Sequence, residues 1–118
     1  MACNLKAKIW LEIDNRKIFG DGPWDILKRV ERTGSLRQAA SEINMSYSQA
    51  WRLIRMIEQN LGCPVLQKKA GGPGGGYSYL TPQALKLVAA YDSFRHEADR
   101  FLEDLYAKHL SPILGPEF

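Results

Sequence analysis

The sequence predicts a mostly α-helical fold with small β elements, and three observations lead to this fold class. The chain has 118 residues, which is enough for a single domain (1–118) with one modest hydrophobic core. Two helix-capping patterns follow each other with only a short turn between them. A segment near the C-terminus then repeats apolar residues at heptad spacing, which is typical of one long helix.

The composition excludes several classes of protein. Hydrophobic residues make up 45% of the chain and charged residues 25%, as in an ordinary globular domain. The apolar runs are short and the N-terminus lacks a signal-like stretch, so we expect no membrane partner and a cytoplasmic location. The two cysteines and the two distant histidines cannot supply a four-ligand zinc site without recruited carboxylates, so we expect no metal and no cofactor. No Ser/His/Asp or Cys/His pattern suggests an active site, and we do not expect an enzyme.

Residues 5–20 are predicted to form a pair of strands. In the segment 8–13 aliphatic residues occupy every second position, which places these three side chains on one face of a strand. Residues 14–16 are of the types that favour a tight turn, and residues 17–19 can return as a second short strand.

Residues 23–62 are predicted to hold a helix-turn-helix core. Pro23 suits the first helical position, and Gly34 suits the end of the same helix. The capping pattern of residues 35–38 then opens a second helix, and that of residues 46–49 opens a third. Two capping patterns joined by so short a turn are the outline of a helix-turn-helix.

The third helix is expected to run to about Leu61 and to have two contrasting faces. Its apolar residues recur at spacings of four, three and four, which places them on one buried face. The opposite face has the same spacing in polar residues, with two arginines and no acid: Ser48, Arg52, Arg55 and Gln59. Trp51 lies at the border of the buried face, where packing is the favoured role. Tyr47 suits packing and phosphate contact equally well.

Residues 64–81 are predicted to form a β-hairpin. Strands at 65–69 and 77–80 flank residues 70–76, which hold five of the ten glycines. A nucleotide-binding loop is disfavoured, because this segment lacks a Gly-Lys-Ser/Thr ending and precedes a strand instead of a helix. A merely solvated hairpin stays open as an alternative. A hairpin directly after a helix-turn-helix is typical of a winged helix, so the sequence predicts a winged helix-turn-helix.

Residues 82–110 are predicted to form one long dimerisation helix. Its apolar residues follow a heptad pattern over three repeats, and a domain this small has too little core to cover so long a stripe. The expected partner is the same helix of a second copy. The residues assigned to this contact are Leu87, Tyr91, Phe94, Ala98, Phe101 and Leu105.

The basic charge is concentrated in the middle of the chain. The formal net charge is +3, and residues 35–82 carry five basic side chains against two acidic ones. Charge alone is also consistent with a solvated surface of mixed sign. The position of this excess on the predicted winged helix is what favours nucleic acid as the partner.

Three motifs carry a resemblance to a known family. They are the Gly-Ser-Leu-Arg-Gln-Ala-Ala run at 34–40, the Ser-Tyr-Ser-Gln-Ala-Trp run at 46–51, and the glycine-rich segment 71–76 with Leu80-Thr81 after it. These motifs resemble the DNA-binding domain of ModE-type molybdate-responsive regulators, a dimeric winged helix of LysR-like type. The resemblance implies a homodimer on a near-palindromic site in double-stranded DNA that regulates molybdenum-related genes. The DNA-binding residues it implies are Ser46, Tyr47, Ser48, Gln49, Arg52, Arg55, Lys68 and Lys69.

The chain departs from this family in two places. Pro73 stands where family wings often carry a lysine, so one phosphate contact at the tip is in doubt. The family's molybdate-binding modules follow the DNA-binding domain, and this sequence stops before them. We therefore expect no molybdate sensing by this short form and allow for a sensor protein acting in trans. The alternative function is a dimeric winged-helix module that binds a protein partner without recognising an operator.

Overall fold

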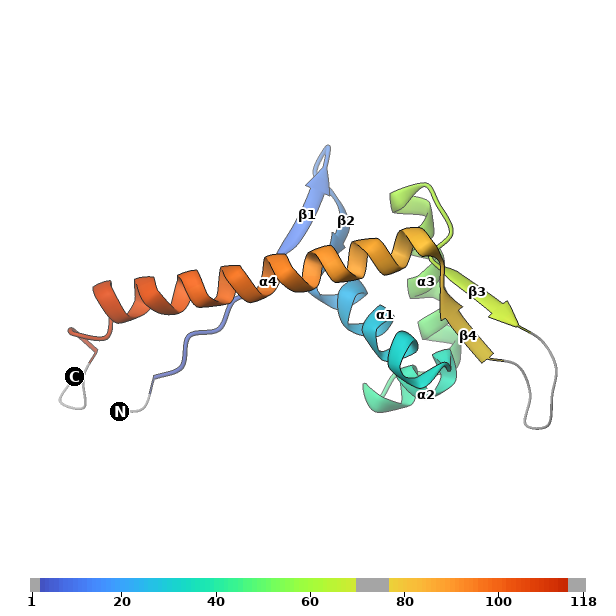
Figure 1. The fold of residues 1–118 in the computed structure, drawn as a ribbon, viewed down its shortest axis with the longest axis horizontal. Helices are drawn as coiled ribbons and strands as arrows, with labels where there is room; N and C mark the ends of the chain where they lie inside the picture. The colour runs from blue at the N-terminus through green and yellow to red at the C-terminus, as the bar shows by residue number, and fades with distance from the viewer. Residues whose placement is uncertain (1–2, 70–76, 115–118) are drawn as a thin grey trace. The chain divides into compact units, whose positions relative to one another are not determined.

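The computed structural model describes residues 3–69 and 77–114. The described part contains four helices and two antiparallel strand pairs (Figure 1), which confirms the predicted winged helix-turn-helix fold class. In chain order the elements are β1 (Trp10–Ile13), β2 (Arg16–Gly20), α1 (Asp21–Thr33), α2 (Leu36–Glu42), α3 (Tyr47–Leu61), β3 (Leu66–Lys69), β4 (Tyr77–Leu80) and α4 (Pro82–His109).

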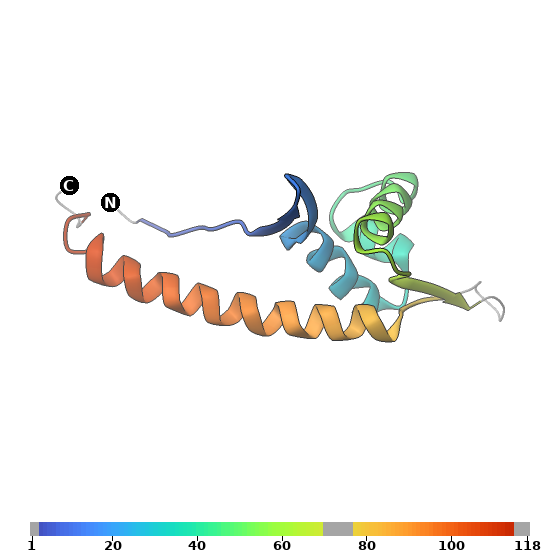
Figure 2. The same ribbon diagram turned by 90° about the horizontal axis from the view of Figure 1, so that it is seen from above.

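The chain divides into two compact units. Residues 9–89 form one, which we call the winged-helix unit. Residues 1–8 and 90–118 form the other, which we call the terminal unit. Helix α4 is continuous through both units (Figure 2), with its first eight residues in the winged-helix unit.

The strand pair forms with the expected turn but begins later than predicted. β1 and β2 pair through a turn in which Asp14 and Asn15 have φ values of 52° and 64°, the left-handed conformation that these residue types tolerate. β1 starts at Trp10, not within 5–8, because the backbone of Ile9 is bonded to Asp21. The Ile9 carbonyl accepts from the backbone N–H of Asp21 at 3.0 Å, and its own N–H donates to the Asp21 carboxylate at 3.2 Å.

Helix α1 starts two residues earlier than predicted. Asp21 is its first residue, and Pro23 occupies the third position instead of the first. Proline is tolerated there because no N–H in the first turn has an acceptor within the helix. The predicted end is confirmed, since Gly34 adopts φ 71° and its N–H bonds the Val30 carbonyl at 2.8 Å.

The helix-turn-helix is built as its capping residues predict. The Ser35 hydroxyl accepts from the Gln38 N–H at 3.0 Å, so this pattern supplies a single cap bond. Ser46 and Gln49 form the complete reciprocal box, with bonds of 3.0 and 3.1 Å. Asn44 makes the tight turn between α2 and α3 at φ 55°.

The core of the winged-helix unit lies between the helices and under the wing strands. The side chains that are 2% exposed or less here are Phe19, Ile26, Leu27, Val30, Leu36, Ala39, Ala40, Ala50, Ile54, Ile57, Val65 and Ala84. They come from β2, from all four helices and from the start of the wing. This shared core fixes the orientation of α3 relative to α2.

The wing strands are tied to the core by backbone bonds. β3 and β4 pair from Leu66–Leu80 to Lys69–Tyr77, and the Ser78 N–H reaches the Gly34 carbonyl at 2.8 Å. β3 begins at Leu66, one residue later than predicted. The predicted glycine-rich tip, Pro73 included, lies outside the described residues.

Helix α4 has the predicted 28 residues and is about 42 Å long. The Thr81 hydroxyl accepts from the Ala84 N–H at 3.2 Å and donates to the Pro64 carbonyl at 2.8 Å. The same side chain therefore caps α4 and anchors it to the start of the wing.

Candidate nucleic-acid interface

Helix α3 has the two faces that its spacing predicts. Ala50 and Ile54 are fully buried and Ile57 is 1% exposed, while Leu61 is half-buried. On the opposite face every member of the predicted polar row is exposed: Ser48, Arg52, Arg55 and Gln59. This exposed row can enter a groove without disturbing the core.

The N-terminus of α3 offers donors for an anion. The capping box engages the N–H groups of Ser46 and Gln49. The N–H groups of Tyr47 and Ser48 lie in the first turn, where the helix supplies no acceptor. Together with the positive end of the helix dipole, they can bind a backbone phosphate.

Both acids of the basic middle segment are held by other groups. Glu42 accepts from Arg29 at 2.9 Å and also from Arg32, and the bond from Arg29 is the main reason that the pKa of Glu42 lies below its ordinary value. The Glu58 carboxylate accepts from the Val65 N–H at 2.9 Å. Neither acid is available to neutralise the basic side chains of the α3 face.

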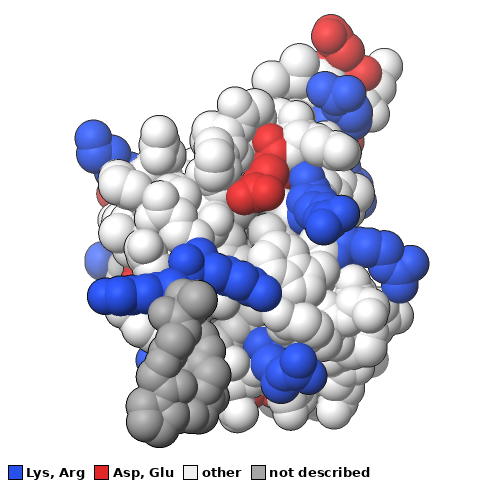
Figure 3. Space-filling view, turned by 90° about the vertical axis from the view of Figure 1, so that its right-hand side faces the viewer, with Lys and Arg blue, Asp and Glu red and all other residues white. Residues whose placement is uncertain are grey.

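The five basic side chains of the same segment are all exposed. They come from α2, α3 and β3: Arg37, Arg52, Arg55, Lys68 and Lys69. Figure 3 shows basic side chains spread around the side of the molecule that carries these elements, with acidic side chains less frequent there. The charge excess seen in the sequence therefore becomes a surface feature.

An aromatic–cation cluster links α2, α3 and β3 at the start of α3. We use this name for Arg37, Tyr47, Trp51 and Lys68. The Arg37 Cζ lies 4.2 Å from the centroid of the Tyr47 ring, and the Lys68 Nζ lies 4.4 Å from that of Trp51. The two rings meet edge to face at 6.2 Å and 83°. The Lys68 Nζ also donates to the Tyr47 hydroxyl at 2.9 Å, and this bond is the main cause that lowers the pKa of Tyr47.

Sequence reasoning missed two members of this cluster as candidate site residues. Arg37 lies ten positions before Tyr47, and only the turn between the helices brings the two side chains together. The position of Trp51 at the border of the buried face favours packing, but its i, i+4 spacing from Tyr47 is the signal that could have placed it in the cluster. Lys69, the other predicted wing contact, has its Nζ 6.0 Å from the centroid of the Tyr77 ring.

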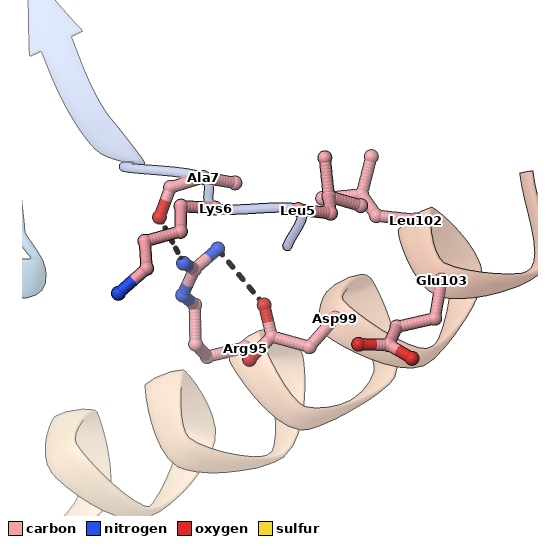
Figure 4. Close-up of a pocket in the computed structure, with 7 residues that line it drawn as sticks. All are labelled: Leu5, Lys6, Ala7, Arg95, Asp99, Leu102 and Glu103. Carbon is pink, nitrogen blue, oxygen red and sulfur yellow. Dashed lines mark hydrogen bonds and ion pairs between the residues drawn. The ribbon is translucent and has the colours of Figure 1, made fainter. Parts of the chain in front are cut away.

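The terminal unit contains a pocket of about 370 Å³ (Figure 4). It lies between the N-terminal segment and α4, and Arg95 is its central polar side chain. Arg95 donates to the Ala7 carbonyl at 2.5 Å and pairs with Asp99 at 3.3 Å. The bond to Ala7 fastens the N-terminal segment to the helix, and the pair with Asp99 lies within α4. Lys6 and Glu103 also line the pocket, so its mixed charge indicates no particular class of ligand.

No group of three or more His, Cys, Asp or Glu side chains is placed to hold a metal ion in residues 3–69 and 77–114. None of the helices in these ranges has the length and hydropathy that a membrane span requires.

Comparison with known proteins agrees with this geometry. Residues 24–85 match the model of a family described as bacterial regulatory helix-turn-helix protein, lysR family. The molybdenum-pterin-binding protein MopB of Rhodobacter capsulatus is 41% identical over 66 residues, which are 56% of this chain and 24% of MopB. The DNA-binding transcriptional dual regulator ModE of Escherichia coli K12 is 31% identical over 116 residues, 94% of this chain and 44% of ModE. The molybdenum transport protein ModE of Azotobacter vinelandii is 29% identical over 114 residues, 97% and 42% of the two chains. The chain spans less than half the length of each of these relatives.

Proposed function

Because the chain belongs to the lysR family of bacterial regulatory helix-turn-helix proteins, a family of transcription regulators and not of enzymes, we propose that it binds a near-palindromic DNA site as a homodimer. The observation that carries the proposal is the exposed polar row of α3, which has two arginines and no acid. The major groove of B-DNA admits an α-helix, and its base edges can be read by such a row.

Each predicted contact residue has a specific role in the proposal. Arg52 and Arg55 bond guanine O6 and N7 in the groove, since a guanidinium can donate two parallel hydrogen bonds. The N-terminal turn of α3 binds the sugar–phosphate backbone through Ser46, Tyr47, Ser48 and Gln49. Lys68 and Lys69 pair with phosphates along the wing.

The proposed dimer contact is the apolar stripe of α4. Phe94 is 48% exposed, Phe101 67% and Leu105 38%, and with the half-buried Ala98 they follow heptad spacing. Leu87 is half-buried and Tyr91 is 4% exposed, so the largest apolar surface offered to a partner begins at Phe94. Large apolar side chains in one exposed row are typical of an interaction surface. Two-fold symmetry then predicts half-sites about 34 Å apart, one turn of DNA.

Selection of bound fragments from genomic DNA tests the proposal. We expect enrichment of fragments that share a near-palindrome, and a fall in affinity of about 10³–10⁵ between 50 and 200 mM salt, as six to ten phosphate contacts give. Absence of any binding at 50 mM salt would contradict the proposal and favour the protein-interaction alternative. Protection of one asymmetric site in a footprint would contradict the dimer.

The regulated genes are part of the same proposal. Several relatives are named for molybdenum transport or molybdenum-pterin binding. We assign this chain to the control of molybdenum-related genes on that ground. Enrichment of selected fragments upstream of such genes is the expected result, and enrichment elsewhere would restrict the proposal to DNA binding.

A further inference from the structure

The aromatic–cation cluster places two positive groups beside one aromatic side chain. The Arg37 Cζ lies 4.2 Å from the centroid of the Tyr47 ring, and the Lys68 Nζ lies 5.6 Å from the same point. Both groups are held by aromatic side chains and share Tyr47 as a partner. The Arg37 guanidinium lies over the Tyr47 ring, and the Lys68 ammonium binds the Tyr47 hydroxyl and lies over the Trp51 ring.

Arg37 keeps its donors available in this arrangement. Its side chain is exposed, in the first turn of α2. A guanidinium held over an aromatic ring keeps its N–H groups able to donate hydrogen bonds, so those of Arg37 can form a bidentate pair with a phosphate. In residues 3–69 and 77–114 no ion pair of Arg37 with an acid is found.

Lys68 is restrained in a similar way. An ammonium has three donors, and the Tyr47 hydroxyl takes one of them. The Trp51 face lies at 4.4 Å and limits the directions in which the long side chain can point. Fixing such a flexible side chain before binding reduces the entropy that a phosphate contact would otherwise cost.

We infer that Arg37 is a further DNA contact residue, and that Tyr47 and Trp51 are positioning residues which hold Arg37 and Lys68 for the same stretch of DNA backbone. The ligand of the cluster is phosphate of double-stranded DNA, next to the donors at the start of α3. The inference rests on the proposed DNA-binding function and extends it to α2. It also assigns Tyr47 a second role, through its ring and hydroxyl, besides its backbone N–H.

The experiment measures the affinity of the full chain for a 30-base-pair duplex of mixed sequence at several salt concentrations. Such a duplex reports phosphate contacts and requires no knowledge of the operator. The variant Arg37→Gln removes the charge and keeps part of the stem. Arg100→Ala, which removes an exposed charge from α4, is the matched control. Thermal unfolding of each variant verifies that the fold is kept.

For Arg37→Gln we expect the slope of log affinity against log salt to fall by about one, as the loss of one phosphate contact gives. Arg100→Ala is expected to keep the wild-type slope. A wild-type slope for Arg37→Gln overturns the assignment of Arg37. If the wild-type chain itself binds no duplex at 50 mM salt, the proposed function fails and the inference fails with it.

Tyr47→Phe tests the positioning role separately. It keeps the ring under Arg37 and removes the hydroxyl that holds Lys68. We expect affinity to fall about two- to tenfold, the effect of one ordinary hydrogen bond, at an unchanged salt slope, because Lys68 keeps its charge. Lys68→Ala should lower both affinity and slope. Wild-type affinity for Tyr47→Phe overturns the positioning role of the Tyr47 hydroxyl.

Discussion

Two arginines on the exposed row of α3 provide the test of whether DNA recognition depends on this helix. The side chains of Arg52 and Arg55 are exposed on the face of α3 opposite its buried residues. Their side chains can therefore be changed with little effect on folding. Because their effect on DNA binding can be measured apart from any effect on folding, they are the most direct residue-level test of function.

We predict that Arg52→Ala loses about 1–3 kcal/mol of specific DNA binding and leaves the melting temperature nearly unchanged. The physical reason is the loss of a bidentate contact to a guanine while the buried face of α3 stays intact. Competition binding against the selected site, together with calorimetric unfolding, measures both quantities. A large drop in melting temperature would place Arg52 in the structure of the unit and not in recognition.

Glu42 gives a second residue-level prediction, about pH. Its folded pKa is lowered, mainly by the hydrogen bond from Arg29. The ion pairs therefore contribute stability that is present in full above the unfolded pKa of about 4.3 and is lost as the pH falls through the folded value. We expect Glu42→Gln to be less stable than wild type at pH 7 and equally stable in acid. Unfolding curves between pH 2 and 7 measure this difference, and a constant difference over that range would contradict it.

At the scale of elements, sequence patterns predicted most of the winged-helix unit. The capping residues located α2 and α3, and the glycines in the left-handed conformation located the ends of α1 and α3. These signals act within a few residues of the chain. The start of β1 could not be predicted, because it depends on the bonds between Ile9 and Asp21, twelve positions apart.

The same limit applies to the candidate site. Periodicity predicted the exposed row of α3, since a helix repeats its faces without reference to other elements. It could not predict that Glu42 and Glu58 are engaged by Arg29 and by the backbone of the wing. It could not predict the contact between Arg37 and Tyr47 either, because that contact depends on the angle between α2 and α3.

Gly20 provides a prediction at the junction of β2 and α1. A Cβ at this position would lie 2.7 Å from the Ile9 carbonyl oxygen and 2.7 Å from the Trp10 Cβ. Backbone atoms cannot move aside cheaply, so we expect Gly20→Ala to destabilise the protein by about 1–3 kcal/mol. Gly22→Ala is the control, because a Cβ there meets nothing within 4 Å and an alanine favours the helix. Chemical denaturation measures the free energy of unfolding of both variants, and equal stabilities of the two would contradict the close approach at Gly20.

At the scale of the whole molecule, the proposal couples dimerisation through the apolar stripe of α4 to the recognition of DNA. In the proposed complex the exposed row on α3 of one copy contacts a single half-site, so high affinity for a palindrome requires two copies bound together. The second contact then benefits from a raised effective concentration, without any new residue touching the DNA. Loss of the dimer should therefore weaken palindrome binding even though every DNA contact residue is kept.

The double variant Phe94→Glu with Phe101→Glu tests this link. Two buried carboxylates at a symmetric apolar contact would repel their counterparts and lose solvation, so we expect monomers by light scattering. The control is His96→Glu with Arg100→Glu, which adds negative charge on the opposite side of the same helix and should leave the dimer intact. The monomeric variant should bind an isolated half-site as wild type does but bind the palindrome much more weakly. A stable dimer in the double variant would refute the α4 contact. A monomer with undiminished palindrome affinity would refute the coupling between dimerisation and recognition, because the two half-sites would then be bound independently.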